Sequence, residues 1–106
     1  MDKRKDIVKK LREFKRNLNN DIKIYKIIFF GSRAHGRPKK DSDIDLIIVS
    51  KKFMGKRFRY RPLGFYKYWS LDYPVDFLCY TPEEFNRLKK QATIIREAVE
   101  KGIEIK

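Results

Sequence analysis

The residues of this chain whose types and spacing could do chemistry lie between positions 31 and 45. Asp43 and Asp45 are separated by one residue in a predicted strand, so their side chains point to the same face. Two neighbouring carboxylates repel each other and are costly to bury, and a cation offsets both effects. Because Mg²⁺ prefers hard oxygen ligands, the pair predicts a magnesium site.

A Gly-Ser turn precedes the two carboxylates. Gly31 allows the backbone to approach a ligand closely, and Ser32 offers a hydroxyl and a backbone N–H. A helical turn that begins at Ser32 would direct further N–H groups to the same point. A phosphate-binding turn that faces a magnesium pair is what transfer of a nucleotide requires.

This arrangement resembles the signature of the nucleotidyltransferases of the DNA polymerase β superfamily. Gly31-Ser32 is followed by ten residues and then by Asp43-x-Asp45, with an apolar strand on each side. The match is closest to the minimal nucleotidyltransferases (MNT) of bacteria and archaea, and it extends to Thr81-Pro82-Glu83-Glu84-Phe85. The resemblance implies a small α/β, polymerase β-like domain, with a mixed three- to four-stranded sheet flanked by helices.

Asp76 is a candidate third acidic ligand. An aspartate between Tyr-Pro-Val and Phe-Leu-Cys is out of character for a buried strand. An arginine could pair with it, but the other two carboxylates favour a metal-binding role. The resemblance also places the family's third acidic residue on the strand beside the Asp-x-Asp strand, and Asp76 is the candidate there.

The resemblance implies roles for all six site residues. Asp43, Asp45 and Asp76 would hold two Mg²⁺ ions, and Asp76 would also help the acceptor hydroxyl lose its proton. Gly31 and Ser32 would hold the β and γ phosphates of the nucleotide, and Arg33 would add charge to the leaving pyrophosphate. His35 has two open interpretations, a catalytic group or a solvated neighbour of the phosphate site.

The elements that position these residues follow from periodicity in one domain over 1–106. We predict a helix over 3–18, strands over 22–30, 43–50 and 75–80, and a short edge strand at Ile103 and Ile105. Thr81, Pro82 and Glu84 predict a capped helix start. Helically spaced apolar residues predict that this helix continues along the core to Gly102: Phe85, Leu88, Ala92, Ile95 and Val99.

The charge balance leaves two interpretations open. With 27 Lys and Arg against 14 Asp and Glu, the formal charge of +13 favours a polyanionic partner such as RNA, but heat-adapted proteins also carry such surfaces. Residues 51–69 interleave basic and aromatic side chains, with a short helix predicted around 63–69. Phe58, Phe65, Tyr66 and Trp69 could stack on bases or could cover one side of the sheet.

The remaining signals concern the cellular context. Cys79 is the single cysteine, which excludes an internal disulfide, fits a reducing interior and predicts a small core residue. The apolar runs are only long enough for strands, so we expect no signal peptide and no membrane span, and a cytoplasmic location.

Three functions from different classes fit these observations. The resemblance implies an antitoxin that is paired with a helical HEPN-type toxin protein and transfers AMP from ATP to a tyrosine hydroxyl of that partner. A non-catalytic module that masks a toxin by contact is the second. The third is a nucleic-acid binder, or a transferase that acts on RNA. The base preference and the oligomeric state are left open.

Overall fold

A four-stranded mixed sheet forms the centre of the protein in the computed structural model, which describes residues 3–40, 42–91 and 94–106. The strands are β1 (Lys26–Phe30), β2 (Ile44–Val49), β3 (Val75–Tyr80) and β4 (Ile103–Glu104), in the order β3-β2-β1-β4. β1 runs antiparallel to both β2 and β4, whereas β2 and β3 are parallel. The predicted α/β fold class, with helices flanking a mixed sheet, is confirmed.

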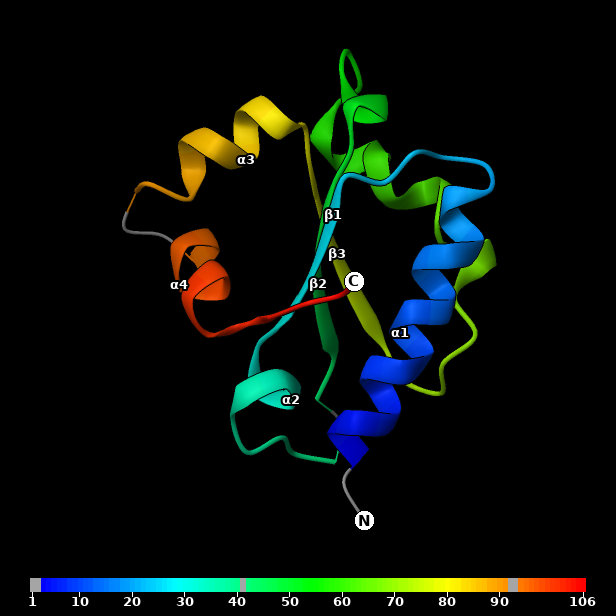
Figure 1. Ribbon diagram of the computed structural model, residues 1–106, viewed down its shortest axis with the longest axis vertical. Helices are drawn as coiled ribbons and strands as arrows, with labels where there is room; N and C mark the ends of the chain where they lie inside the picture. Colours follow the sequence, from blue (N-terminus) through cyan, green and yellow to red (C-terminus); the bar gives the residue numbers. More distant parts are fainter. Residues whose placement is uncertain (1–2, 41, 92–93) are drawn as a thin grey trace.

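Helices cover both faces of the sheet (Figure 1). On one face lie α1 (Lys3–Asn19) and the 3-10 helices η1 (Lys51–Phe53), η2 (Phe58–Gly64) and η3 (Tyr66–Tyr68). On the other face lie α3 (Pro82–Leu88) and α4 (Ile94–Lys101), whereas α2 (Ser32–His35) lies at one end of the sheet. β1 and β2 supply apolar side chains to both cores, as expected for central strands.

The predicted N-terminal helix and third strand are confirmed, but the first strand is shorter than predicted. α1 buries the predicted stripe of Ile7, Leu11, Phe14 and Leu18. β1 begins at residue 26 rather than 22, because the preceding residues form a turn that returns to α1. In that turn Ile24 donates its N–H to the Asn19 side chain at 2.9 Å.

The helix predicted from Thr81 to Gly102 is wrong as a single element. The structure divides it into α3 and α4, and Lys89 and Lys90 form turns between them. Ile95 is buried as predicted, whereas Val99 is 42% exposed, because the break gives α4 its own orientation and Ala98 faces the sheet instead. Ala92 lies outside the described residues.

The aromatic residues after β2 mainly cover the sheet. Phe65, Tyr66 and Trp69 make ring contacts with Phe77 of β3, at centroid distances between 5.3 and 5.8 Å. The short helix predicted around 63–69 is wrong as one element: η2 ends at Gly64, and only residues 66–68 form a helical turn, the 3-10 helix η3. Phe58 packs on Tyr80 but remains 45% exposed. Cys79 is buried as predicted, and burial raises its pKa to about 12.

The predicted capping box at the start of α3 is confirmed, and it also anchors Arg61. Glu84 accepts the Thr81 N–H at 2.8 Å, and the Thr81 hydroxyl accepts the Glu84 N–H at 3.2 Å. Arg61 donates to both Glu84 oxygens, at 2.6 and 3.2 Å, and to the Cys79 carbonyl. These bonds, led by those from Arg61, hold the pKa of Glu84 at about 2.

We expect this contact to make stability depend on acidic pH. A carboxyl group whose pKa is lower when folded stabilises the fold above its ordinary pKa and loses that contribution as pH falls towards about 2. Glu84→Gln keeps the cap but removes the charge, so it should cost about 2 kcal/mol at pH 7 and much less near pH 2. Urea unfolding measures both values.

Glu83→Gln is the matched control for this prediction, since Glu83 is an exposed glutamate in the same helical turn. A loss equal to that of Glu84→Gln would show that the general charge at the helix start, rather than the Arg61 contact, is responsible.

Candidate active site

Strand register brings the Gly-Ser turn and two of the candidate carboxylates to the same end of the sheet. Asp45 on β2 lies opposite Phe30, the last residue of β1, on one side and opposite Asp76 of β3 on the other. Neighbouring strands are about 4.8 Å apart, so Asp45 and Asp76 have adjacent backbones. Gly31 directly follows Phe30 and therefore lies beside Asp45 at this end of the sheet.

Gly31 is packed against the Asp45 side chain. A Cβ atom at position 31 would lie 2.3 Å from Oδ2 of Asp45, which is closer than any real contact allows. The residue also has a φ of 85°, in the left-handed region that favours glycine. Two separate constraints therefore require glycine here, and one of them is the position of a candidate catalytic carboxylate.

The Asp45 carboxylate is influenced electrostatically by the other two candidate carboxylates. Burial raises the pKa of Asp45, and the negative charges of Asp76 and Asp43 raise it further. Asp45 is half-buried, whereas the other two are exposed. Strand register thus brings Asp45 and Asp76 together, and that all three side chains form one acidic site stays a prediction.

A divalent metal ion fits the chemistry of this site. Its donors are carboxylate oxygens, and their mutual repulsion at Asp45 is what a cation would relieve. Within the part of the chain that the structure describes, no three His, Cys, Asp or Glu side chains are gathered as a ready metal-binding group.

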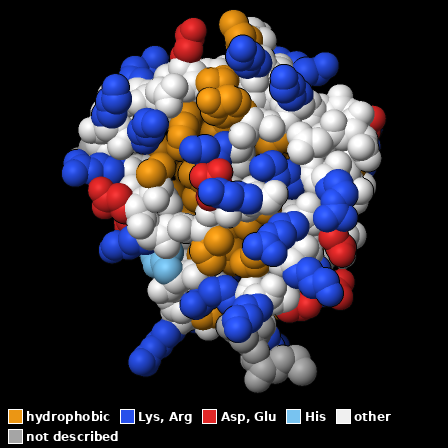
Figure 2. Space-filling view, viewed as in Figure 1, with side chains coloured by type: hydrophobic (Ala, Val, Ile, Leu, Met, Phe, Trp, Pro, Cys, Tyr) orange, Lys and Arg blue, Asp and Glu red, His pale blue; other side chains and the backbone are white. Residues whose placement is uncertain are grey.

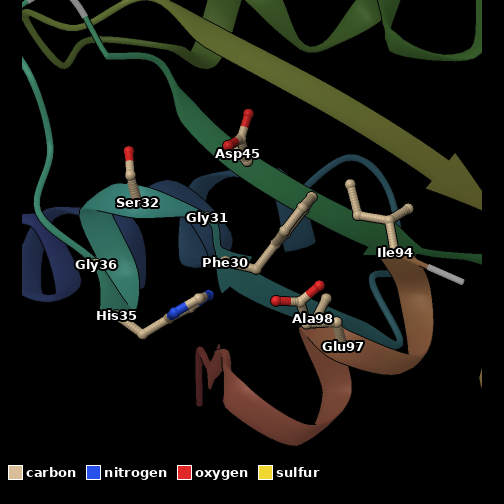
Figure 3. A pocket seen from close by; sticks show the side chains of 9 residues that line it. All are labelled: Phe30, Gly31, Ser32, His35, Gly36, Asp45, Ile94, Glu97 and Ala98. Atoms are coloured by element: carbon tan, nitrogen blue, oxygen red, sulfur yellow. The ribbon is translucent and has the colours of Figure 1, made fainter.

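A cavity of about 390 Å³ lies beside Asp45 (Figure 3). Gly31, Ser32 and His35 line it from the turn and α2, together with Asp45. The Ser32 and Asp45 side chains lie along the same side of the cavity in this view, and His35 lies on the opposite side of α2. Neither Asp43 nor Asp76 is among the residues that line it, so the cavity meets the acidic site at Asp45.

The far wall of this cavity comes from α4, which sequence reasoning treated only as a core helix. Ile94, Glu97 and Ala98 face the cavity, and Ile94 is 57% exposed. Glu97 lies 3.7 Å from the Lys101 ammonium. No sequence pattern indicated this wall, since only the structure shows that Ile94 is exposed on the same helical face as Glu97, three residues later.

Arg33 makes contacts that favour a role in positioning over direct contact with phosphate. Its Nε donates to the Ser42 carbonyl at 2.6 Å, and its Nη2 donates to the carbonyls of Lys39 and Lys40. The guanidinium also lies 4.6 Å from the ring centroid of Tyr73. Arg33 thereby links the turn after β1 to the segments that lead into β2 and β3. These two strands carry Asp45 and Asp76.

We expect Arg33→Lys to impair the protein chiefly through its structure. Lysine keeps the positive charge but cannot reproduce the fork of donors, so the free energy of unfolding should fall by about 1–3 kcal/mol. Urea unfolding and the KM for ATP, the donor that the sequence resemblance implies, should be measured together. A variant of unchanged stability with a raised KM would instead show that Arg33 contacts the donor.

Comparison with known proteins identifies the family. Residues 8–105 match the model of the nucleotidyltransferase domain. The chain belongs to this nucleotidyltransferase family. A relative from Haemophilus influenzae, "Probable protein adenylyltransferase MntA", is 32% identical over 82 residues, which cover 76% of this chain and 72% of the relative.

A solved structure also shares the fold of this nucleotidyltransferase domain. It is titled a "putative nucleotidyltransferase" from Sulfolobus solfataricus, and it superposes with a TM-score of 0.64 at 22% identity. The superposition covers 79% of this chain and 75% of the other. The fold that the sequence resemblance implied is thus found in this neighbour.

Proposed function

We propose that this nucleotidyltransferase moves AMP from ATP to a hydroxyl of a protein partner. The observation that carries the proposal is the contact of Gly31 with Asp45, in register with Asp76. The name of the Haemophilus influenzae relative supports both AMP as the transferred group and protein as the acceptor. We place the activity in the cytoplasm, where ATP and Mg²⁺ are available.

Asp43, Asp45 and Asp76 are the residues that would hold two Mg²⁺ ions in this proposal. Bound there, the ions would neutralise charge on the triphosphate and on the attacking oxygen. Ser32 and the backbone at Gly31 would bind the β and γ phosphates, because they border the cavity at Asp45. Ile94 and Ala98 would exclude water from the opposite side of the bound nucleotide.

The proposed partner is a helical toxin of the HEPN type, which the protein would inactivate as its antitoxin. The sequence resemblance to minimal nucleotidyltransferases supports this pairing, with a tyrosine hydroxyl as acceptor and a complex with the partner as the working assembly. A module that acts by contact alone would not need a glycine fitted against Asp45, so the geometry favours catalysis. Among the described residues, no helix is long and apolar enough to cross a membrane.

The acceptor can be tested in a lysate of the source organism. The lysate is incubated with the purified protein, Mg²⁺ and ATP labelled at the α-phosphate, and the products are then digested separately with protease and with RNase. We expect label in one protein band that protease removes and RNase does not. Label that only RNase removes would overturn a protein acceptor.

A further inference from the structure

A second cavity lies at the end of the sheet opposite the candidate active site. It has a volume of about 480 Å³ and is lined by Lys23, Ile24 and Tyr25, which precede β1, and by Lys51 and Lys52, which follow β2. Asp45 lies at the other end of β2, opposite the last residue of β1. Its volume is in the range of ligand-binding pockets.

Buried hydrogen bonds hold the backbone of this cavity in place. The fully buried Ser50 donates its hydroxyl to the Lys23 carbonyl at 2.8 Å and accepts the Lys52 N–H at 3.1 Å. Tyr25 donates its N–H to the Val49 carbonyl at 2.8 Å. Ser50 therefore links the two chain segments that line the cavity, and these hydrogen bonds fix the shape of the cavity.

The side chains around this cavity are available to a ligand. Lys23, Lys51 and Lys52 are exposed, and within the described residues no carboxylate forms an ion pair with them. The nearby Asp21 carboxylate accepts the Tyr68 hydroxyl instead. Tyr25 exposes 66% of its surface beside these positive charges.

The surface next to the cavity also combines exposed apolar side chains with basic ones. Met54, Phe58 and Tyr60 are between 45 and 64% exposed, and they alternate with basic residues that are also exposed: Lys56, Arg57 and Arg59. Figure 2 shows apolar side chains among Lys and Arg at the top of the view, where residues 51–64 lie in Figure 1. This surface could extend a binding site beyond the cavity.

We propose that Lys23, Tyr25, Lys51 and Lys52 form a binding site for single-stranded nucleic acid. The tyrosine ring offers a stacking surface for one base, and the three lysines neutralise the adjoining phosphates. An acidic peptide would also meet the lysines but would leave the exposed ring without a partner, so base and phosphate together match the site better. The site is separate from the transfer reaction and does not depend on it.

The test measures binding of a fluorescent twelve-nucleotide RNA by anisotropy over a series of salt concentrations. Because each phosphate contact contributes about 0.7 to the salt slope for single strands, Lys23→Ala/Lys51→Ala/Lys52→Ala should reduce the slope by about 2. Tyr25→Ala should weaken binding by about tenfold at an unchanged slope, and Tyr25→Phe should not. DNA of the same sequence, bound equally well, would support a site that does not use the 2′-hydroxyl.

A charge-matched variant on α1, Lys5→Ala/Lys9→Ala/Arg12→Ala, is the control, since these exposed side chains lie on another element. The salt slope of this control should stay close to that of the original protein. An equal loss of slope in both triple variants would overturn the proposal in favour of diffuse attraction to the +13 charge. Unchanged binding by Tyr25→Ala, or tighter binding of a polyglutamate peptide, would also overturn it.

Discussion

Replacing both Asp43 and Asp45 by asparagine should abolish Mg²⁺-dependent nucleotide transfer while the protein stays folded. Asparagine keeps the shape of each side chain but removes the negative charge that a divalent ion needs. We expect the rate of transfer to fall by about three orders of magnitude or more. Transfer of α-phosphate label measures the rate, and circular dichroism checks the fold.

The double variant should be at least as stable as the original protein, because it no longer has to bury the Asp45 carboxylate beside the negative charges of Asp76 and Asp43. Asp76→Asn should also lose most of the activity, since Asp76 lies in register with Asp45. Asp72→Asn is the matched control, an exposed aspartate four residues before Asp76 that should retain full activity. Full activity in the double variant would refute the metal assignment.

Gly31→Ala should be the second most damaging change. The added methyl group would lie 2.3 Å from Oδ2 of Asp45, which is too close for a non-bonded contact, so the carboxylate has to move. A displacement of about 1 Å at a catalytic group can reduce the rate by about 100-fold. We expect a loss of transfer on that scale, measured by the rate of label transfer at saturating ATP.

Gly55→Ala separates this contact from backbone strain. Gly55 has a similar φ of 78°, but a Cβ atom there meets nothing within 4 Å. Both variants should lose about 1–2 kcal/mol of unfolding free energy from the left-handed conformation. Only Gly31→Ala should also lose transfer, and equal activity in the two variants would contradict the proposed role of Gly31.

Much of this site could be predicted because it depends on local patterns. Asp43 and Asp45 were proposed from their alternation with apolar residues in a strand predicted to begin at Asp43, although β2 begins at Ile44, and Asp76 from a charge in an otherwise apolar strand. The short helix after Gly31 was also correctly predicted, because glycine and serine mark such a turn. These signals require only a few consecutive residues.

The parts that could not be predicted depend on contacts between distant segments. Apolar spacing alone ran through the break between α3 and α4, so it could not show that Ile94 and Glu97 reach the cavity from a second helix. The family resemblance assigned Arg33 to the leaving pyrophosphate. Its bonds to the carbonyls of residues 39, 40 and 42 depend on the path of a turn that no periodicity describes.

The most direct test of the central claim follows the two ends of ATP separately. Purified protein, Mg²⁺ and the lysate are supplied in parallel with ATP labelled at the α-phosphate and with ATP labelled at the γ-phosphate. A nucleotidyltransferase places the α label on the acceptor and releases the γ label as pyrophosphate, and Asp43→Asn/Asp45→Asn does neither. The γ label on the acceptor, with no α label there, would show phosphate transfer and contradict the account.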